Sequence, residues 1–207
     1  MGVTIHYGGS LKSIDLLDNL IDEMVDISDA NNWKYRIIDS RKQINVEGNE
    51  ELPHLKGISF GPDEAESIWF TFIESGQLIS PMVAMFQQHE PEQTKDMIHH
   101  AFTKTQSAGP DFHIKIVKIM KFVSNKYFSK WNVKDESQYY ETENREHLVE
   151  CMGAIDRSIA ALNEAFEVHG ESMSNKSEEE IKDFIGQVLG NEALDIKVIK
   201  LGNEEEE

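Results

Sequence analysis

The chain has 207 residues, a length that suits one domain or two, and 39% of its residues are hydrophobic, which is enough to build a buried core. Lysine and arginine total 20 against 38 aspartate and glutamate residues, so the formal net charge is −18 at pH 7. A negative field of this size repels the phosphates of nucleic acids and the anionic surface of membranes, and we expect neither as a partner.

The first half of the chain predicts strands around one helix. Between residues 14 and 30 apolar residues recur at helical spacing, with aspartates on the opposite side, which predicts an amphipathic helix. The Gly8-Gly9-Ser10 cluster is expected to end the strand before it. Short runs rich in β-branched and aromatic residues predict strands at 3–7, 34–39, 43–46, 55–60, 67–73 and 77–79. Their connections are too short for parallel crossovers, so the predicted sheet is mostly antiparallel.

The second half is predicted to be mainly helical. Pro91 marks the start of a short helix with Ala101 and Phe102 on its apolar face, and residues 111–129 predict a helix that is apolar around most of its circumference. Further helices are predicted at 144–167 and 177–189, and short strands at 131–133 and 194–198. The predicted fold class is α+β: a mostly antiparallel sheet from the N-terminal half, helices packed on one face, and a central apolar helix near 111–129.

The domain organisation follows from two changes in composition near the C-terminus. A polar stretch at 172–176 interrupts the helices, and the chain ends in the run Glu204 to Glu207. We therefore expect a single α+β domain over 1–171. Residues 172–203 are expected to form a helix and an edge strand that dock on this domain, and residues 204–207 a solvated acidic tail.

The expected compartment is the cytoplasm. The first residues lack the charged start, apolar run and small-residue cleavage site of a signal peptide, and no stretch approaches the roughly 20 apolar residues of a membrane-spanning helix. The single cysteine, Cys151, excludes an internal disulfide and a four-cysteine zinc site, and its place on an apolar helical stripe predicts a buried, inert thiol.

His113 is the main candidate for chemistry. It falls near the middle of the apolar side of the predicted helix 111–129, where a buried imidazole needs a partner. Two interpretations stay open. His113 is either a ligand or general base in a pocket, or a core histidine whose ring nitrogens bond to a carbonyl or an acidic side chain.

The residues that would complete a site around His113 lie before and after its helix. The loop 103–111 offers Lys104 and Gln106 just before a helix N-terminus, where anions are favoured. The acidic segment after the helix offers carboxylates and a phenol as ligand-binding candidates: Asp135, Glu136 and Tyr139.

A metal site is not predicted. His99 and His100 are weak candidates beside His113, because adjacent helical residues point about 100° apart and cannot converge on one ion without other partners. The acidic segment 135–143 lacks a calcium-loop pattern, and the loop 103–111 lacks a phosphate-binding glycine motif. We therefore predict no cofactor.

Charge is unevenly distributed along the chain. Residues 112–134 contain six lysines and no acidic residue, and they are expected either to pair with the acidic residues that follow or to face an anionic ligand. The helix 14–30 carries five aspartates on one side, which form either a solvated face or a surface for a basic partner.

These patterns favour one function over a second. The leading hypothesis is a non-catalytic binding or regulatory module for a basic protein partner, because no catalytic signature is assembled in the sequence. The alternative is an enzyme or a binder of a small anion or metal, with a pocket near His113 and the 103–111 loop. The apolar stripe of helix 144–167 also suits a homo-oligomer contact.

Overall fold

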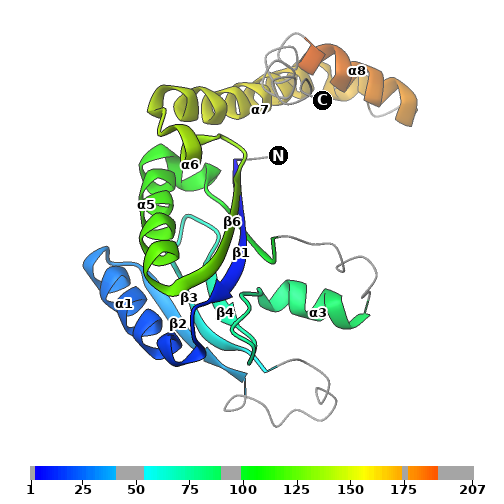
Figure 1. The fold of residues 1–207 in the computed structure, drawn as a ribbon. Helices are drawn as coiled ribbons and strands as arrows, with labels where there is room; N and C mark the ends of the chain where they lie inside the picture. Colours follow the sequence, from blue (N-terminus) through cyan, green and yellow to red (C-terminus); the bar gives the residue numbers. More distant parts are fainter. Residues whose placement is uncertain (1–2, 41–53, 90–98, 174–176, 191–207) are drawn as a thin grey trace, which may run out of the picture. The chain divides into compact units, whose positions relative to one another are not determined.

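The computed structural model describes residues 3–40, 54–89, 99–173 and 177–190 (Figure 1). The chain divides into two compact units, residues 2–148 and residues 149–207 with residue 1. The boundary between the two units falls within a long helix, whereas the sequence predicts the domain boundary at 172. The assignment of domains stays a prediction. The predicted α+β class with antiparallel sheets is confirmed.

The described elements of the first unit are both strands and helices. In chain order they are β1 (Thr4–Leu11), α1 (Leu17–Ala30), β2 (Lys34–Asp39), β3 (Lys56–Gly61), β4 (Ile68–Phe72), α3 (Pro81–His89), β5 (Ala101–Lys104), α5 (Gly109–Tyr127), β6 (Phe128–Asp135), α6 (Tyr139–Thr142), α7 (Arg145–Met173) and α8 (Glu178–Gly190). Short 3-10 turns at Ile14–Leu16 and Gln106–Ala108 precede α1 and α5.

Two three-stranded antiparallel sheets form the first unit. The β1 sheet has the order β5-β1-β6, and the β3 sheet has the order β2-β3-β4. In the β1 sheet, His6 lies opposite Phe102 on β5 and opposite Lys134 on β6. Because side chains alternate along a strand, Ile5 and Tyr7 point to the other face, where both are fully buried.

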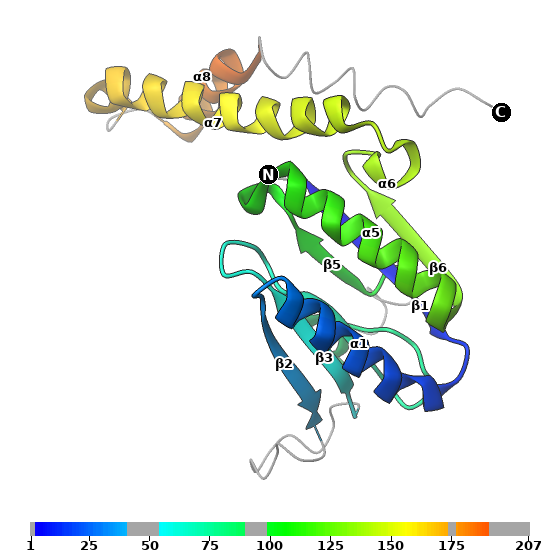
Figure 2. The ribbon, with the colours of Figure 1, turned by 90° about the vertical axis from the view of Figure 1, so that its left-hand side faces the viewer.

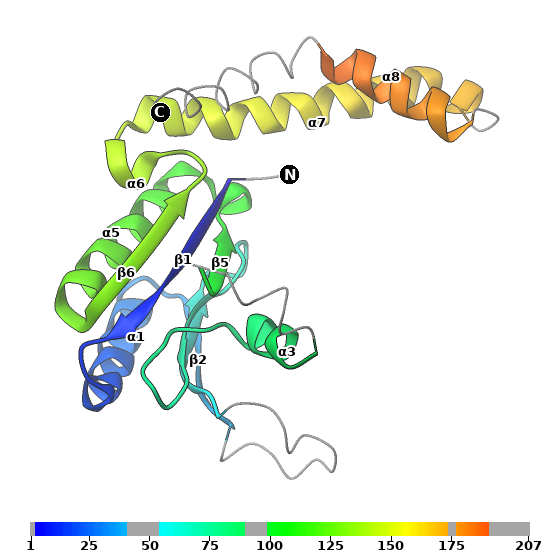
Figure 3. The ribbon, with the colours of Figure 1, turned by 45° about the vertical axis from the view of Figure 1, so that its right-hand side comes forward.

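Helices α1 and α5 cover the buried faces of the sheets. They lie side by side in front of the strands in Figure 2. Both are amphipathic: α5 buries one face, whereas Phe122 on its other face remains 43% exposed. Helix α3 lies on the opposite side of the β3 sheet from α1 (Figure 3). It packs through Val83 and Ala84 against Ile79 and Leu55.

Tyr7 ties the two sheets together. Its hydroxyl donates to the carbonyl oxygen of Trp69 on β4 at 3.2 Å and accepts from the amide of Trp69 at 3.0 Å. Its ring meets Phe70 edge to face at 6.0 Å between centroids. Burial raises the pKa of the Tyr7 hydroxyl far above its ordinary value, more than its hydrogen bond to Trp69 lowers it. Tyr7 therefore stays a neutral hydrogen-bonding group within the core.

Two sequence predictions about the β1 sheet are wrong, each for a tertiary reason. The Gly8-Gly9-Ser10 cluster does not end the first strand, since β1 continues to Leu11. Glycine is needed at position 9 because a side chain there would collide with the carbonyl oxygen of Lys130 on β6. Ala101 and Phe102 belong to strand β5, where they pair with β1, and not to a helix. Tertiary pairing overrides the short helical pattern there.

Other predicted elements differ in extent. Residues 77–79 make only isolated bridges to Ser10 and Phe72, and helix α3 is an element that the sequence does not predict. The strand at 131–133 is longer, as β6. The predicted strands 43–46 and 194–198, the helix start at Pro91 and the acidic tail 204–207 lie outside the described residues.

Helices α7 and α8 are capped by side chains at the first residues of the predicted helices 144–167 and 177–189. The amide of His147 donates to Asn144 at 3.1 Å at the start of α7, and Ser177 and Glu180 exchange capping-box hydrogen bonds at the start of α8. Cys151 on α7 is buried, and Phe166 meets Phe184 at 6.2 Å within the second unit. None of the described helices combines the length and the apolar surface needed to cross a bilayer.

Candidate functional site

The ends of strands β5 and β6 divide the predicted site residues into two groups. Asp135 and Glu136 are neighbours in sequence, but Asp135 points toward α5 and is buried, whereas Glu136 is exposed and meets His6 of β1. Thr105 and Lys104 separate in the same way, because Thr105 is fully buried and Lys104 is exposed. The candidates therefore do not form one site, because consecutive side chains where β5 and β6 end differ in burial and in their partners.

His113 lies in a closed hydrogen-bond network beneath the β1 sheet. Its Nδ1 lies 2.7 Å from Oγ1 of Thr105, and its Nε2 lies 3.0 Å from Oδ2 of Asp135. The His113 and Asp135 side chains are both 0% exposed. The ring of Tyr139 packs edge to face on the imidazole at 5.9 Å. Of the sequence-predicted residues, His113, Asp135 and Tyr139 thus meet.

The network is complete whether the imidazole is neutral or protonated. A carboxylate only accepts, so Nε2 carries the hydrogen donated to Asp135. In the neutral ring, Nδ1 accepts from the Thr105 hydroxyl. In the protonated ring, Nδ1 donates to Thr105, whose hydroxyl turns to the carbonyl oxygen of Val3 at 3.3 Å. His113 therefore matches the interpretation of a core histidine with satisfied ring nitrogens.

The Asp135 carboxylate organises the turn that follows β6. It accepts hydrogen bonds from the amide and hydroxyl of Ser137 at 2.9 and 2.8 Å and from the amide of Tyr140 at 2.9 Å. Burial alone raises the pKa of Asp135, but the hydrogen bond and charge of His113 together with the Ser137 hydrogen bonds outweigh it. The pKa of this carboxyl therefore lies below its ordinary value.

Stability in acid is expected to depend on Asp135. Because folding lowers its pKa, the ionised carboxyl contributes full stability above its unfolded pKa of about 3.9, and this contribution is lost as the pH falls through the lower folded pKa. The difference in the free energy of unfolding between wild type and Asp135→Asn should therefore be larger at about pH 5 than at about pH 3. Urea titrations followed by tryptophan fluorescence measure it.

A control separates this effect from general acid denaturation. Asp111 is exposed and pairs only with Arg145 among the described residues, at 3.1 Å, so Asp111→Asn should follow the wild type at every pH. A gap between wild type and Asp135→Asn that widens in acid would contradict the assigned network.

The order Thr105, His113 and Asp135 resembles the hydroxyl, base and carboxylate of a hydrolase triad. Catalysis by such a group requires that substrate reach the hydroxyl and the base directly or through one water. Thr105 and His113 are both 0% exposed, and neither lines the described pocket. In this conformation the hydrogen bonds of the three residues connect α5 to the β1 sheet.

The second group of predicted residues lies on or beside the outer face of the β1 sheet. Glu136 accepts from the amide of Thr4 at 2.9 Å and lies 3.6 Å from Nε2 of His6. The rings of His6 and His99 are 6.3 Å apart. Burial, then the charges of His6, Lys134 and His100, lower the pKa of His99, and burial lowers that of His100.

The remaining candidates have local structural partners. His100 contacts the amide of Gln77 at 3.2 Å, Gln106 accepts from the amide of Val3 at 3.3 Å, and Lys104 lies 3.9 Å from Glu66. Among the residues that the structure describes, no three histidine, cysteine or acidic side chains are placed to hold a metal ion.

Two of the four lysines of α5 are paired with carboxylates within the chain. Lys121 pairs with Glu143 at 2.6 Å, and Lys126 pairs with Glu23 of α1 at 2.8 Å. Burial is the largest single influence on the pKa of Glu23 and raises it, but the contacts with Lys126 and Tyr127 together lower it below its ordinary value. The contact with Lys121 likewise lowers the pKa of Glu143. The sequence suggested only acidic residues after the helix as partners, and Glu23 comes from before it.

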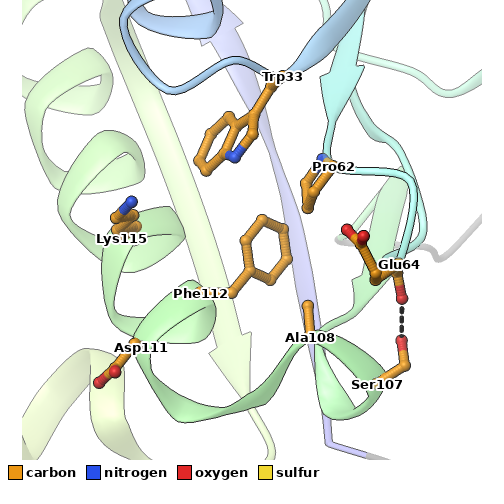
Figure 4. Close-up of a pocket in the computed structure, with 8 residues that line it drawn as sticks. All are labelled: Trp33, Pro62, Glu64, Ser107, Ala108, Asp111, Phe112 and Lys115. Carbon is orange, nitrogen blue, oxygen red and sulfur yellow. Dashed lines mark hydrogen bonds between the residues drawn. The ribbon is translucent and has the colours of Figure 1, made fainter.

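A pocket of about 350 Å³ opens at the N-terminal end of α5 (Figure 4). Two aromatic side chains, two carboxylates and one lysine line it together with small residues of the adjoining loops. The lining residues are Trp33, Pro62, Glu64, Ser107, Ala108, Asp111, Phe112 and Lys115. They come from the α1–β2 junction, the loop after β3, and the start of α5.

The pocket lies at the predicted loop but is built from different residues. Ser107, Ala108 and Asp111 belong to the 103–111 segment, whereas Lys104, Gln106 and His113 do not line the pocket. Its aromatic walls, Trp33 and Phe112, carry no motif that marks them in the sequence, and only the packing of α1 beside α5 brings them together.

The aspartates of α1 form an exposed row. They are Asp15, Asp18, Asp22, Asp26 and Asp29, the first of them in the preceding turn. Asp18 pairs with Lys56 of β3, but no described cationic side chain lies within ion-pair distance of Asp22, Asp26 or Asp29. This acidic row is therefore the largest unneutralised charged feature on α1.

Comparison with known proteins gives no relative for this chain: no family model, no curated protein and no solved structure matches it.

Proposed function

We propose that this protein is a non-catalytic binding module for a basic protein partner, which it contacts through the acidic row of α1. The observation that carries the proposal is the row itself, five exposed aspartates of which only Asp18 has a described cationic partner. Aligned charges of one sign speed encounter with an oppositely charged partner and fix its orientation.

Two further observations support binding over catalysis. The Thr105, His113 and Asp135 network is enclosed and internally satisfied, so its hydrogen bonds stabilise the fold. The α5 lysines that could counter the acidic row are partly used, since Lys126 holds Glu23. The negative electrostatic field around a protein of net charge −18 attracts basic protein surfaces at long range.

Charge reversal on α1 tests the proposal. The double variant Asp22→Lys with Asp26→Lys should weaken binding of a short fluorescein-labelled peptide of arginine and glycine about tenfold, because the attraction at the contact surface becomes repulsion. Fluorescence anisotropy at rising salt measures the affinity, which should fall as ionic strength increases.

The matched control is Glu146→Lys with Glu150→Lys on α7. Both pairs are exposed, four residues apart on a helix, and change the net charge equally. An equal loss of affinity in both double variants would mean that total charge and not the α1 row attracts the peptide. Affinity that is independent of salt would equally overturn the proposal.

The second candidate function is an enzyme or small-ligand binder of an anion or metal, cytoplasmic like the first. The pocket at the start of α5 favours it, because that is where the sequence placed a ligand site. Inorganic phosphate, used as a probe in the experiment below, separates this candidate from the first. A homo-oligomer through α7 stays a prediction.

A further inference from the structure

We propose that the pocket lined by Trp33, Phe112 and Glu64 receives an arginine side chain of the basic partner. This inference rests on the proposed function and identifies the anchor point of the same interface. Protein interfaces concentrate their affinity in a few side chains that fill well-formed pockets, and arginine is prominent among them.

The aromatic walls suit a planar cation. Trp33 meets Phe112 edge to face at 5.5 Å and stacks on Phe60 at 6.4 Å, so the indole is held from two sides. Phe112 is itself only 7% exposed and forms a rigid wall. A guanidinium is flat and weakly hydrated, so it stacks on aromatic faces that a compact ammonium contacts less well.

The chain itself shows that this indole accepts a cation. Nζ of Lys115 lies 5.8 Å from the centre of the Trp33 ring and is held there by a 3.0 Å hydrogen bond to Asn31. Lys115 therefore marks the ring as a cation site and also competes for it. A partner's guanidinium would bind on the side of the pocket away from Lys115, where Pro62 and Glu64 lie (Figure 4).

The charges of the pocket favour a cation over an anion. Two carboxylates line it against one lysine, and that lysine is already bound to Asn31. Asp111 is paired with Arg145, whereas no described cation lies within ion-pair distance of Glu64. Glu64 is thus the carboxylate available to a guanidinium, and two hydrogen bonds to one carboxylate are the preferred geometry of arginine.

The pocket is continuous with the acidic row. Trp33 follows α1 directly, and its amide donates to the carbonyl oxygen of Ser28 in the last turn at 2.9 Å. Asp29 and Asp26 therefore lie on the turns of α1 nearest to the indole. A basic segment running along α1 would reach the pocket at the C-terminal end of that helix.

The experiment uses the full chain and the labelled arginine and glycine peptide, with a peptide of lysine and glycine for comparison. Glu64→Gln should weaken arginine-peptide binding about fivefold, whereas Asp63→Asn, one residue earlier and outside the pocket, should change it less than about twofold. The wild type should prefer the arginine peptide by about three- to tenfold.

Two more variants test the role of the Trp33 indole. General electrostatic attraction does not predict the size of their effects on peptide binding. Trp33→Leu should abolish the preference for arginine over lysine, provided that circular dichroism shows a native fold. Lys115→Met should tighten arginine-peptide binding about threefold or more, since it removes a competing cation from the indole. Lys118→Met, an exposed lysine of the same helix outside the pocket, is its control.

The outcomes separate the two proposals. If the α1 double variant weakens binding but Glu64→Gln matches Asp63→Asn and the arginine preference survives Trp33→Leu, the pocket inference is overturned and the proposed function stands. If the wild type binds neither peptide at low salt, both fall. Inorganic phosphate that displaces the peptide from the wild type, and less from Lys115→Met, would instead assign the pocket to an anion and overturn the inference.

Discussion

Replacing His113 by alanine is expected to lower the free energy of unfolding by about 3 to 5 kcal/mol, because it removes the imidazole that faces the buried carboxylate of Asp135 and leaves only the hydrogen bonds of Ser137 and Tyr140. The Thr105 hydroxyl loses its contact with Nδ1 at the same time. All three tryptophans lie in the first unit, so their fluorescence during urea denaturation reports on its unfolding.

The prediction separates a structural from a functional histidine. His99→Ala removes a half-buried imidazole from the outer region of the β1 sheet and should cost about 1 kcal/mol or less. In conditions where His113→Ala remains folded, its affinity for the arginine peptide should equal that of the wild type. A fully stable His113→Ala that has lost binding would show that His113 belongs to a ligand site and not to the core.

Replacing Gly57 by alanine is expected to cost about 4 kcal/mol or to prevent folding of the first unit. Strand β3 lies between β2 and β4, and a methyl group at Gly57 would collide with the carbonyl oxygen of Phe70 on β4. The obstacle is backbone in the middle strand of a sheet, so no side-chain movement relieves it. Thermal unfolding monitored by circular dichroism tests the loss.

Gly61 is a matched control on the same strand. Its φ of +149° is close to the +157° of Gly57, but an added methyl group would have no neighbour closer than 3.8 Å. Gly61→Ala should therefore show the backbone strain alone, about 1 to 2 kcal/mol. Equal losses in the two variants would mean that the conformation of Gly57, and not its contact with β4, sets the requirement for glycine.

The sequence by itself determines the four longest described helices and the exposed charges of this protein. The segments that became α1, α7 and α8 each contain an apolar stripe at helical spacing, and the α5 segment is apolar around most of its circumference. Asn144 and Ser177 mark two of the helix starts. These signals are local, because a helix closes its hydrogen bonds within four residues. The acidic row of α1 is readable for the same reason.

The tertiary structure alone decides which side chains meet. Ala101 and Phe102 become a strand because β1 offers them a pairing edge, and Thr105, His113 and Asp135 meet because β6 returns antiparallel beside β1. The pocket joins three segments that are far apart in the chain. Such contacts depend on strand pairing and helix packing across long loops, and neither leaves a periodic signal in the segments that it joins.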